Sequence, residues 1–187
     1  MLKKYLNNTM KLRFGFVFII LFFFLNSCGY QLSANHIYLP DHISAVYVEN
    51  PKNSTYEPNI SIYLKNAIIN DLRLEPNLRI VSNKSDAQAF IKTDIVSFSA
   101  LPASYNASGF ASMYSCSIII KLSLIAKDGK KLISEKTLTS STNYSTPSNT
   151  NINNINSIES AKLEATKATI SDLASLIREE LFMSSGF

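Results

Sequence analysis

The stretch that decides the fold is Met113-Tyr-Ser-Cys-Ser-Ile-Ile-Ile-Lys-Leu-Ser-Leu-Ile-Ala-Lys127. Its side chains fall into two sets on alternate positions. One set is Tyr114, Cys116, Ile118, Ile120, Leu122, Leu124 and Ala126, and the other includes Ser115, Ser117, Lys121, Ser123 and Lys127. A period of two is typical of a strand with one buried face and one solvated face. The pattern predicts a long, half-buried strand over residues 113–127 and places Cys116 in the core.

A hairpin follows this strand. Asp128-Gly129 is a strong turn signal, and residues 130 to about 140 read as the returning strand. Two registers are open. With a two-residue loop, Lys121 faces Lys136, and like charges directly opposite are destabilising unless an anion lies between them. Such an arrangement would suit a phosphorylated, acylated lipid.

The second register has a three-residue loop with Gly129 in the left-handed conformation. It sets Lys121 opposite Glu135 and brings Leu132 and Leu138 onto the buried face. This register packs better and is favoured. Under either register Lys136 projects from the middle of the strand, either as a ligand contact or as a lysine that protects a sheet edge from aggregation.

The rest of the chain supplies further elements by the same reasoning. Strands are expected at residues 43–49, 78–82 and 89–99, and helices at 58–74 and 158–182 with Ser157 as N-cap. A loop is expected at 100–112 and a polar loop at 141–157. The order β-α-β-β-β-β-α predicts an α+β fold, namely a two-layer sandwich of a mixed four- to five-stranded sheet with two helices on one face.

The positive charge of the chain is concentrated at its N-terminus. The net charge is +4, but residues 1–27 hold four basic side chains and no acidic ones. The other 160 residues carry 14 basic and 14 acidic side chains, which removes the electrostatic reason to expect a nucleic-acid partner.

The same N-terminal segment has the form of an export signal. Basic residues precede the apolar run Phe14 to Leu25, which at twelve residues is short for a membrane-spanning helix. Leu25-Asn26-Ser27-Cys28-Gly29 then resembles the bacterial lipoprotein signal, in which the cysteine is acylated and the chain is cut before it. The alternative is an ordinary signal peptide with Cys28 an incidental thiol.

By this resemblance Cys28 is the lipid-attachment residue, and Gly29 after it implies sorting to the outer membrane. The expected organisation is a signal peptide at 1–27, a lipidated tether at 28–42 and a single α+β domain at 43–187. Each buried CH₂ contributes roughly 0.8 kcal/mol, and one acyl chain alone holds a protein only marginally. The three acyl chains of such a lipoprotein therefore make a persistent anchor.

Catalytic and metal-binding chemistry has no candidate in the sequence. There is no Gly-rich phosphate loop, no Cys-x-x-Cys, and no serine beside a plausible base. Two cysteines exclude a disulfide-rich scaffold or a four-cysteine metal site. We therefore expect no cofactor and a binding or assembly role.

Several short motifs resemble the LptE (RlpB) family of lipopolysaccharide-assembly lipoproteins. They are Cys28-Gly-Tyr-Gln-Leu32, Val46-Tyr-Val-Glu-Asn50, Tyr56-Glu-Pro-Asn59, Arg79-Ile-Val-Ser82, and Gly109 to Tyr114 opening the long strand. The resemblance implies a non-enzymatic outer-membrane lipoprotein on the periplasmic side. Its partners would be lipopolysaccharide and an LptD-like β-barrel, which it plugs and helps to assemble.

The resemblance also implies a contact between basic side chains and lipopolysaccharide, and Lys136 falls in a comparable strand position. The hairpin adds Lys121 as a second candidate for this contact. Tyr105 and Phe110 are expected to be exposed in the loop before the long strand, and we take them as candidate contacts to the partner. The alternative function is that of a generic outer-membrane-anchored periplasmic adaptor lipoprotein with another envelope partner.

Overall fold

The computed structural model describes residues 39–145 and 154–183. Residues Cys28 and Gly29, with the expected signal peptide and most of the tether, lie outside the described residues. In chain order the elements are η1 (Pro40–His42), β1 (Ala45–Val48), β2 (Lys52–Asn53), α2 (Ile60–Leu72), β3 (Arg79–Ile80), η2 (Lys84–Asp86), β4 (Ala89–Tyr105), β5 (Ala111–Ala126), β6 (Lys131–Ser145) and α3 (Asn154–Met183).

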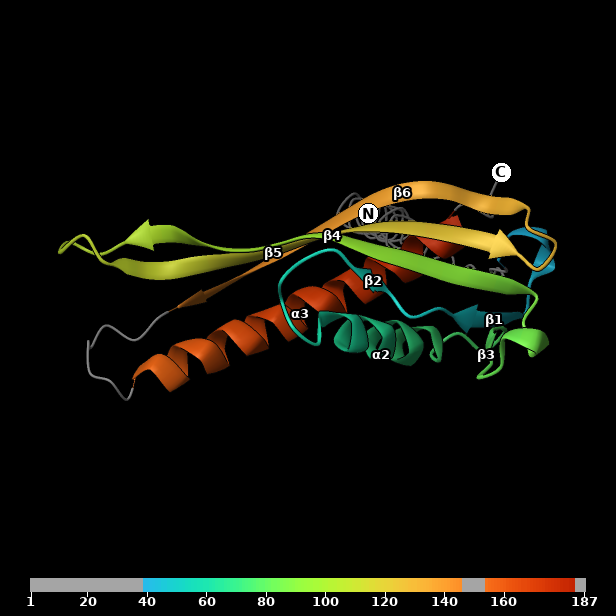
Figure 1. The fold of residues 1–187 in the computed structure, drawn as a ribbon, viewed down its shortest axis with the longest axis horizontal. Coiled ribbons are helices and arrows are strands. Elements are labelled where there is room, and N and C mark those ends of the chain that lie inside the picture. The colour runs from blue at the N-terminus through green and yellow to red at the C-terminus, as the bar shows by residue number, and fades with distance from the viewer. Residues whose placement is uncertain (1–38, 146–153, 184–187) are drawn as a thin grey trace, which may run out of the picture. The chain divides into compact units, whose positions relative to one another are not determined.

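The strands form one mixed sheet in the order β3-β1-β4-β5-β6, with β2 beside β4. β1 runs parallel to both β3 and β4, whereas β4, β5 and β6 are antiparallel. Both helices lie against the same face of the sheet (Figure 1). The predicted α+β architecture is confirmed, with the two-residue strand β2 as an addition to the expected sheet.

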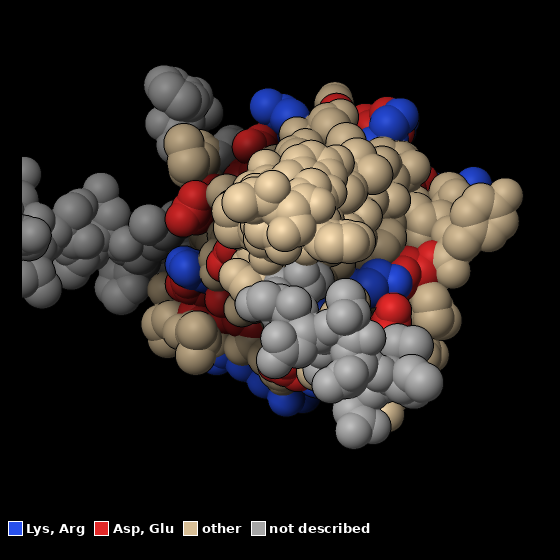
Figure 2. All heavy atoms as spheres, turned by 90° about the vertical axis from the view of Figure 1, so that its left-hand side faces the viewer, with Lys and Arg blue, Asp and Glu red and all other residues tan. Residues whose placement is uncertain are grey.

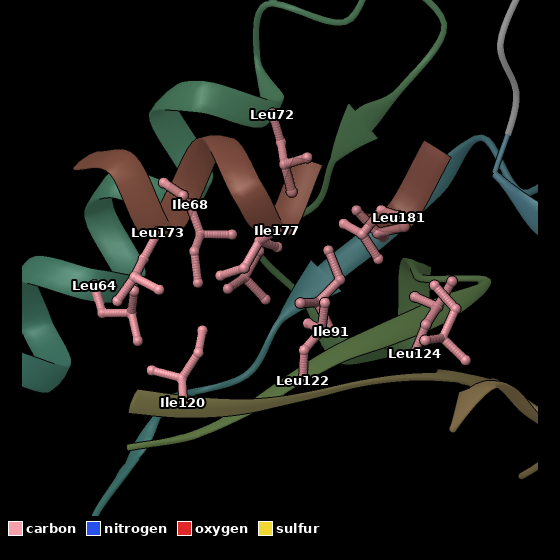
Figure 3. Packing of buried hydrophobic residues seen from close by; sticks show 14 of the residues in the cluster. Leu64, Ile68, Leu72, Ile91, Ile120, Leu122, Leu124, Leu173, Ile177 and Leu181 are labelled. Carbon is pink, nitrogen blue, oxygen red and sulfur yellow. The ribbon is translucent and has the colours of Figure 1, made fainter. Parts of the chain in front are cut away.

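Helical spacing explains why α2 and α3 pack where they do. In α2 every fourth residue from Ile60 to Leu72 is buried, and α3 buries Ile170, Leu173, Ile177 and Leu181. These side chains meet Ile91 of β4 and four residues of β5 in one core (Figure 3). The four are Ile118, Ile120, Leu122 and Leu124. Cys116 is fully buried, as the alternation predicts.

Two segments expected to be loops are strands. β4 continues to Tyr105 and β5 begins at Ala111, so the expected loop at residues 100–112 shrinks to a turn at 106–110. β6 continues to Ser145, although residues 141–157 were expected to be a polar loop. α3 also begins at Asn154, which places Ser157 inside the helix and not at its N-cap.

The β5–β6 turn follows the favoured register, but the rest of the hairpin does not. Gly129 has φ +90°, and the N–H of Ala126 donates to the carbonyl of Lys130 at 2.8 Å, as in a three-residue loop. Two register shifts then move β6, so that Lys121 lies opposite Thr137. Ile133, and not Leu132, is consequently the residue buried beside Leu124.

Candidate functional site

Charge divides the sheet into two halves along its strands. Between Asp94 in β4 and Lys121 in β5, the chain has 26 consecutive residues without a charged side chain, and β6 has none from Thr137 to Ser145. Because these segments pair with one another, they make one continuous region of the sheet. We call residues 95–120 the arm, and the arm together with 137–145 the charge-free half.

The turn of the arm is ordered by its own hydrogen bonds. The N–H of Asn106 donates to the carbonyl of Phe110 at 2.8 Å, and the N–H of Gly109 donates to the carbonyl of Asn106 at 3.0 Å. The side-chain Oδ1 of Asn106 accepts from the N–H groups of Ser108 and Phe110, both at 3.0 Å. Gly109 has φ +80°, a conformation that favours glycine. The arm is therefore a continuous hairpin and not an irregular loop.

Apolar side chains stand exposed on this arm. Leu101, Tyr105 and Phe110 are each 63–64% exposed, and the expectation that the two aromatic residues are accessible is confirmed. The arm reaches beyond the N-terminal end of α3 (Figure 1). Seen from that end, the surface in front is uncharged, and the Lys, Arg, Asp and Glu atoms lie around its rim (Figure 2).

The sheet face away from the helices is rich in hydroxyl groups within the charge-free half. Ser115 and Ser117 of β5 lie there, opposite Asn143 and Ser141 of β6. Ser99 of β4 lies opposite Ser117 on the other side. No helix among residues 39–145 and 154–183 covers this face (Figure 1). It offers donors and acceptors without net charge.

Lys121 lies on this same open face, at the border of the charge-free half. Its Nζ is 2.7 Å from Oε1 of Glu135. The hydrogen bond and charge of Glu135 raise the pKa of Lys121, and Lys121 in turn lowers the pKa of Glu135. Asp94, whose Oδ1 is buried without a hydrogen-bond partner, lies directly opposite Lys121 in β4. Lys121 therefore faces carboxylates and not Lys136.

Lys136 lies opposite Leu122, whose side chain points toward the helices, so it projects on the other face of the sheet. Its Nζ is 3.3 Å from Oε1 of Glu180 in α3, and its side chain is 55% exposed. Lys121 and Lys136 are thus on opposite faces, and the structure does not bring them into one basic site.

No group of three or more His, Cys, Asp or Glu side chains within the described ranges is arranged to hold a metal ion. The helices of that part of the chain are also too short or too polar to cross a membrane. The candidate sites of the described residues are therefore surfaces, namely a charge-free arm, an open hydroxyl-rich face and two separated lysines.

A family model described as LptE, lipopolysaccharide-assembly, matches residues 43–182. The chain belongs to the LptE family. The match spans the whole sheet, all of α2 and nearly all of α3, so the predicted LptE family is confirmed. The motif at residues 28–32 lies outside the match. This family acts in lipopolysaccharide assembly, so the chain is a lipopolysaccharide-assembly protein.

Two solved structures with TM-scores above 0.5 show the same fold. A Xanthomonas campestris protein aligns with a TM-score of 0.55 at 11% identity, over 78% of this chain and 88% of its own. An uncharacterized lipoprotein B from Nitrosomonas europaea aligns with a TM-score of 0.55 at 14% identity, over 84% and 94%. Rare lipoprotein B from Shewanella oneidensis has a TM-score of 0.49 at 16% identity, over 73% and 92%. No curated protein sequence matches.

The structure of this LptE family member adds features that the motif analysis missed. Leu101 joins Tyr105 and Phe110 as an exposed apolar residue of the arm, and Glu180 is the partner of Lys136. The charge-free run of 26 residues is visible in the sequence alone. Its continuation into β6 is not, because it depends on the pairing of residues 137–145 with β5.

Proposed function

We propose that this chain is an outer-membrane lipoprotein, anchored through Cys28 on the periplasmic side, that plugs and helps to assemble an LptD-like β-barrel during lipopolysaccharide transport. Family membership gives the process, and the charge-free half of the sheet is the observation that supports the plug role. A plug must be enclosed by its partner. Enclosure favours a surface without charged side chains, because a charged side chain would have to give up its hydration.

The energetics of enclosure favour the charge-free half as the inserted part. Removing an unpaired charge from water costs several kcal/mol, whereas hydroxyl groups can exchange water for hydrogen bonds to another polar surface. The interior of a large outer-membrane barrel is polar and is plugged in several classes. Ser99, Ser115, Ser117 and Ser141 on the open face suit such a wall, and Tyr105 and Phe110 provide apolar contacts at the end of the arm.

A matched pair of serines tests this assignment. Ser117 and Ser123 are both half-buried on the open face of β5, Ser117 inside the charge-free half and Ser123 beside Lys92 outside it. We expect Ser117→Asp in the full-length chain to reduce recovery of the barrel in affinity purification from outer membranes at least tenfold. Ser123→Asp should leave recovery unchanged, because its charge lies next to a lysine.

Recovery of a different envelope protein in place of a large barrel would contradict the plug role and favour the adaptor function. Equal loss of the barrel in both variants, with both still folded by circular dichroism, would show that the charge-free half is not what the barrel encloses.

Lipopolysaccharide contact is the second part of the proposal, and we assign it to Lys136 with Lys121 as the lesser candidate. A lipid phosphate that replaces Glu180 beside Lys136 exchanges one anionic partner for another, so the ammonium is never left unpaired. Lys121 is held more closely, at 2.7 Å from Glu135.

We expect Lys136→Ala to weaken lipopolysaccharide binding several-fold, as measured by the dissociation constant of the full chain in detergent. Lys131→Ala is the matched control, since Lys131 is an exposed lysine of the same strand. If the two variants bind lipopolysaccharide equally well, Lys136 is not part of the contact.

A further inference from the structure

We propose that the outer edge of β6, from Thr137 to Ser145, accepts an extended, uncharged segment of the barrel partner, which adds to the sheet as a further strand. This inference rests on the proposed function, in which the partner is an LptD-like β-barrel. β6 ends the strand order, and no other strand of the described residues pairs with its outer edge. Such an edge exposes a row of unpaired backbone N–H and C=O groups.

The first part of β6 is protected against pairing. The residues opposite Leu122, Leu124 and Ile125 are Lys136, Ile133 and Lys131, so each step inserts an extra residue into β6. These are two bulges on the edge strand. The same part has the charged side chains Lys131, Glu135 and Lys136. Bulges and edge charges are the devices by which natural sheets prevent strand addition.

These devices stop at Lys136. From there to Ser145 every residue of β6 pairs with β5 in one unbroken register, from Leu122↔Lys136 to Met113↔Ser145. The nine residues Thr137–Ser145 have no charge and no proline. A long, regular and unprotected edge is the template that an added strand requires, with its main-chain groups providing the bonds. The contrast within a single strand indicates that the second part is left open for a partner.

The position of this open edge identifies the occupant. It pairs with residues 113–121 of β5, and so belongs to the same charge-free half that the proposed function places inside the barrel. A segment lying there meets no counter-charge on β6 from Thr137 onward, which is why we infer that the segment is uncharged. A second copy of this chain fits less well. Antiparallel pairing of two β6 strands would point their two arms in opposite directions, so one barrel cannot receive both.

Hydrogen–deuterium exchange of the full lipidated chain in detergent, alone and in its complex with the barrel, tests the proposal. In the chain alone, the N–H groups of residues 137–145 that point away from β5 should exchange rapidly. In the complex their exchange should slow at least tenfold, while the already protected N–H groups change little. Exchange at Lys131–Lys136 should change much less, because that part of the edge is bulged and charged.

A variant pair gives an independent readout. Ser141 and Ser134 are both exposed residues of β6, one on the open edge and one in the bulged part. A charge at Ser141 also enters the charge-free half, so recovery of the barrel is measured together with exchange. In the complex that still forms, we expect Ser141→Lys to abolish the protection of 137–145 and Ser134→Lys to leave it intact.

Three outcomes overturn the inference, and they are distinguishable. If the complex forms but exchange at 137–145 is unchanged, strand addition is wrong while the plug function stands. If no barrel complex forms, both proposals fail. If protection appears in the chain alone and rises with its concentration, the occupant is a second copy of the chain.

Discussion

At the scale of single residues, the burial of Cys116 makes the proposed lipid anchor at Cys28 testable by thiol labelling. Its side chain is fully buried, and its Sγ lies 3.7 Å from Oγ1 of Thr166 in α3. A buried thiol in apolar surroundings is inert to reagents in water. The chain has two cysteines, and the proposal blocks the other, Cys28, by acylation.

We therefore predict that the mature full-length protein shows no reactive thiol when native and one thiol when unfolded, as measured by mass after maleimide labelling. Cys116→Ala should show none in either state. One labelled thiol in the native protein, retained in Cys116→Ala, would mean that Cys28 is free and that the lipid anchor is absent.

Lys162 and Glu57 form a half-buried ion pair that joins α3 to the segment before α2. Nζ lies 3.0 Å from Oε2, and the side chains are only 24% and 19% exposed. The ammonium also lies 5.5 Å from the centre of the Phe98 ring. The hydrogen bond to Glu57 raises the pKa of Lys162. The pair therefore contributes stability that is fully present below the unfolded lysine pKa of about 10.4 and is lost as pH rises through the raised pKa.

We expect Lys162→Met to lower the free energy of unfolding by about 1–2 kcal/mol at pH 7, by removing a hydrogen bond between charged groups. The difference between wild type and variant should shrink as the pH rises above about 10.4. Lys167→Met is the control, since its pair with Glu164 is exposed and is worth at most about 0.5 kcal/mol. Denaturant unfolding at pH 7 and pH 11 measures both, and a difference that persists undiminished at pH 11 would contradict the assignment.

At the scale of elements, sequence reasoning succeeded where apolar periodicity was strong. Alternation in residues 113–127 predicted β5, and four-residue spacing from Ile60 to Leu72 predicted α2, because in both cases one face is buried. It failed where strands have few apolar residues. Residues 141–145 are rich in Ser, Thr and Asn, a composition typical of a loop. They form a strand because their backbone pairs with that of β5.

The hairpin register was only partly predictable for a similar reason. Gly129 determines the turn, and that part was predicted correctly. The two bulges that follow add residues on β6 without any sequence signal such as glycine, and they decide that Ile133 is buried and that Lys121 lies opposite Thr137. In the favoured register Lys136 falls on the buried face with Leu132 and Leu138, whereas Lys121 falls on the other face. The two bulges together add two residues, so they keep this separation and change only which residues lie opposite one another.

At the scale of the whole described domain, the two halves of the sheet differ in charge. The half near the β5–β6 turn holds the ion pairs of Lys121 and Lys130. The apolar core under α2 and α3 continues from this half into the charge-free half as far as Ile118. The other half has an uncharged sheet and ends in the exposed arm (Figure 2). This division is what a protein needs if one part is to be enclosed by a partner while the other stays in water.

The central claim is that the arm is the part of the chain that enters the barrel, and site-specific photo-crosslinking tests it most directly. A photoreactive residue replaces either Phe110, 63% exposed at the end of the arm, or Leu74, 73% exposed after α2. Both positions are exposed and apolar, so they differ chiefly in location. The account predicts that the Phe110 probe in the full-length chain crosslinks to a large outer-membrane β-barrel and that the Leu74 probe does not. Crosslinking of the barrel from Leu74 but not from Phe110 would contradict it.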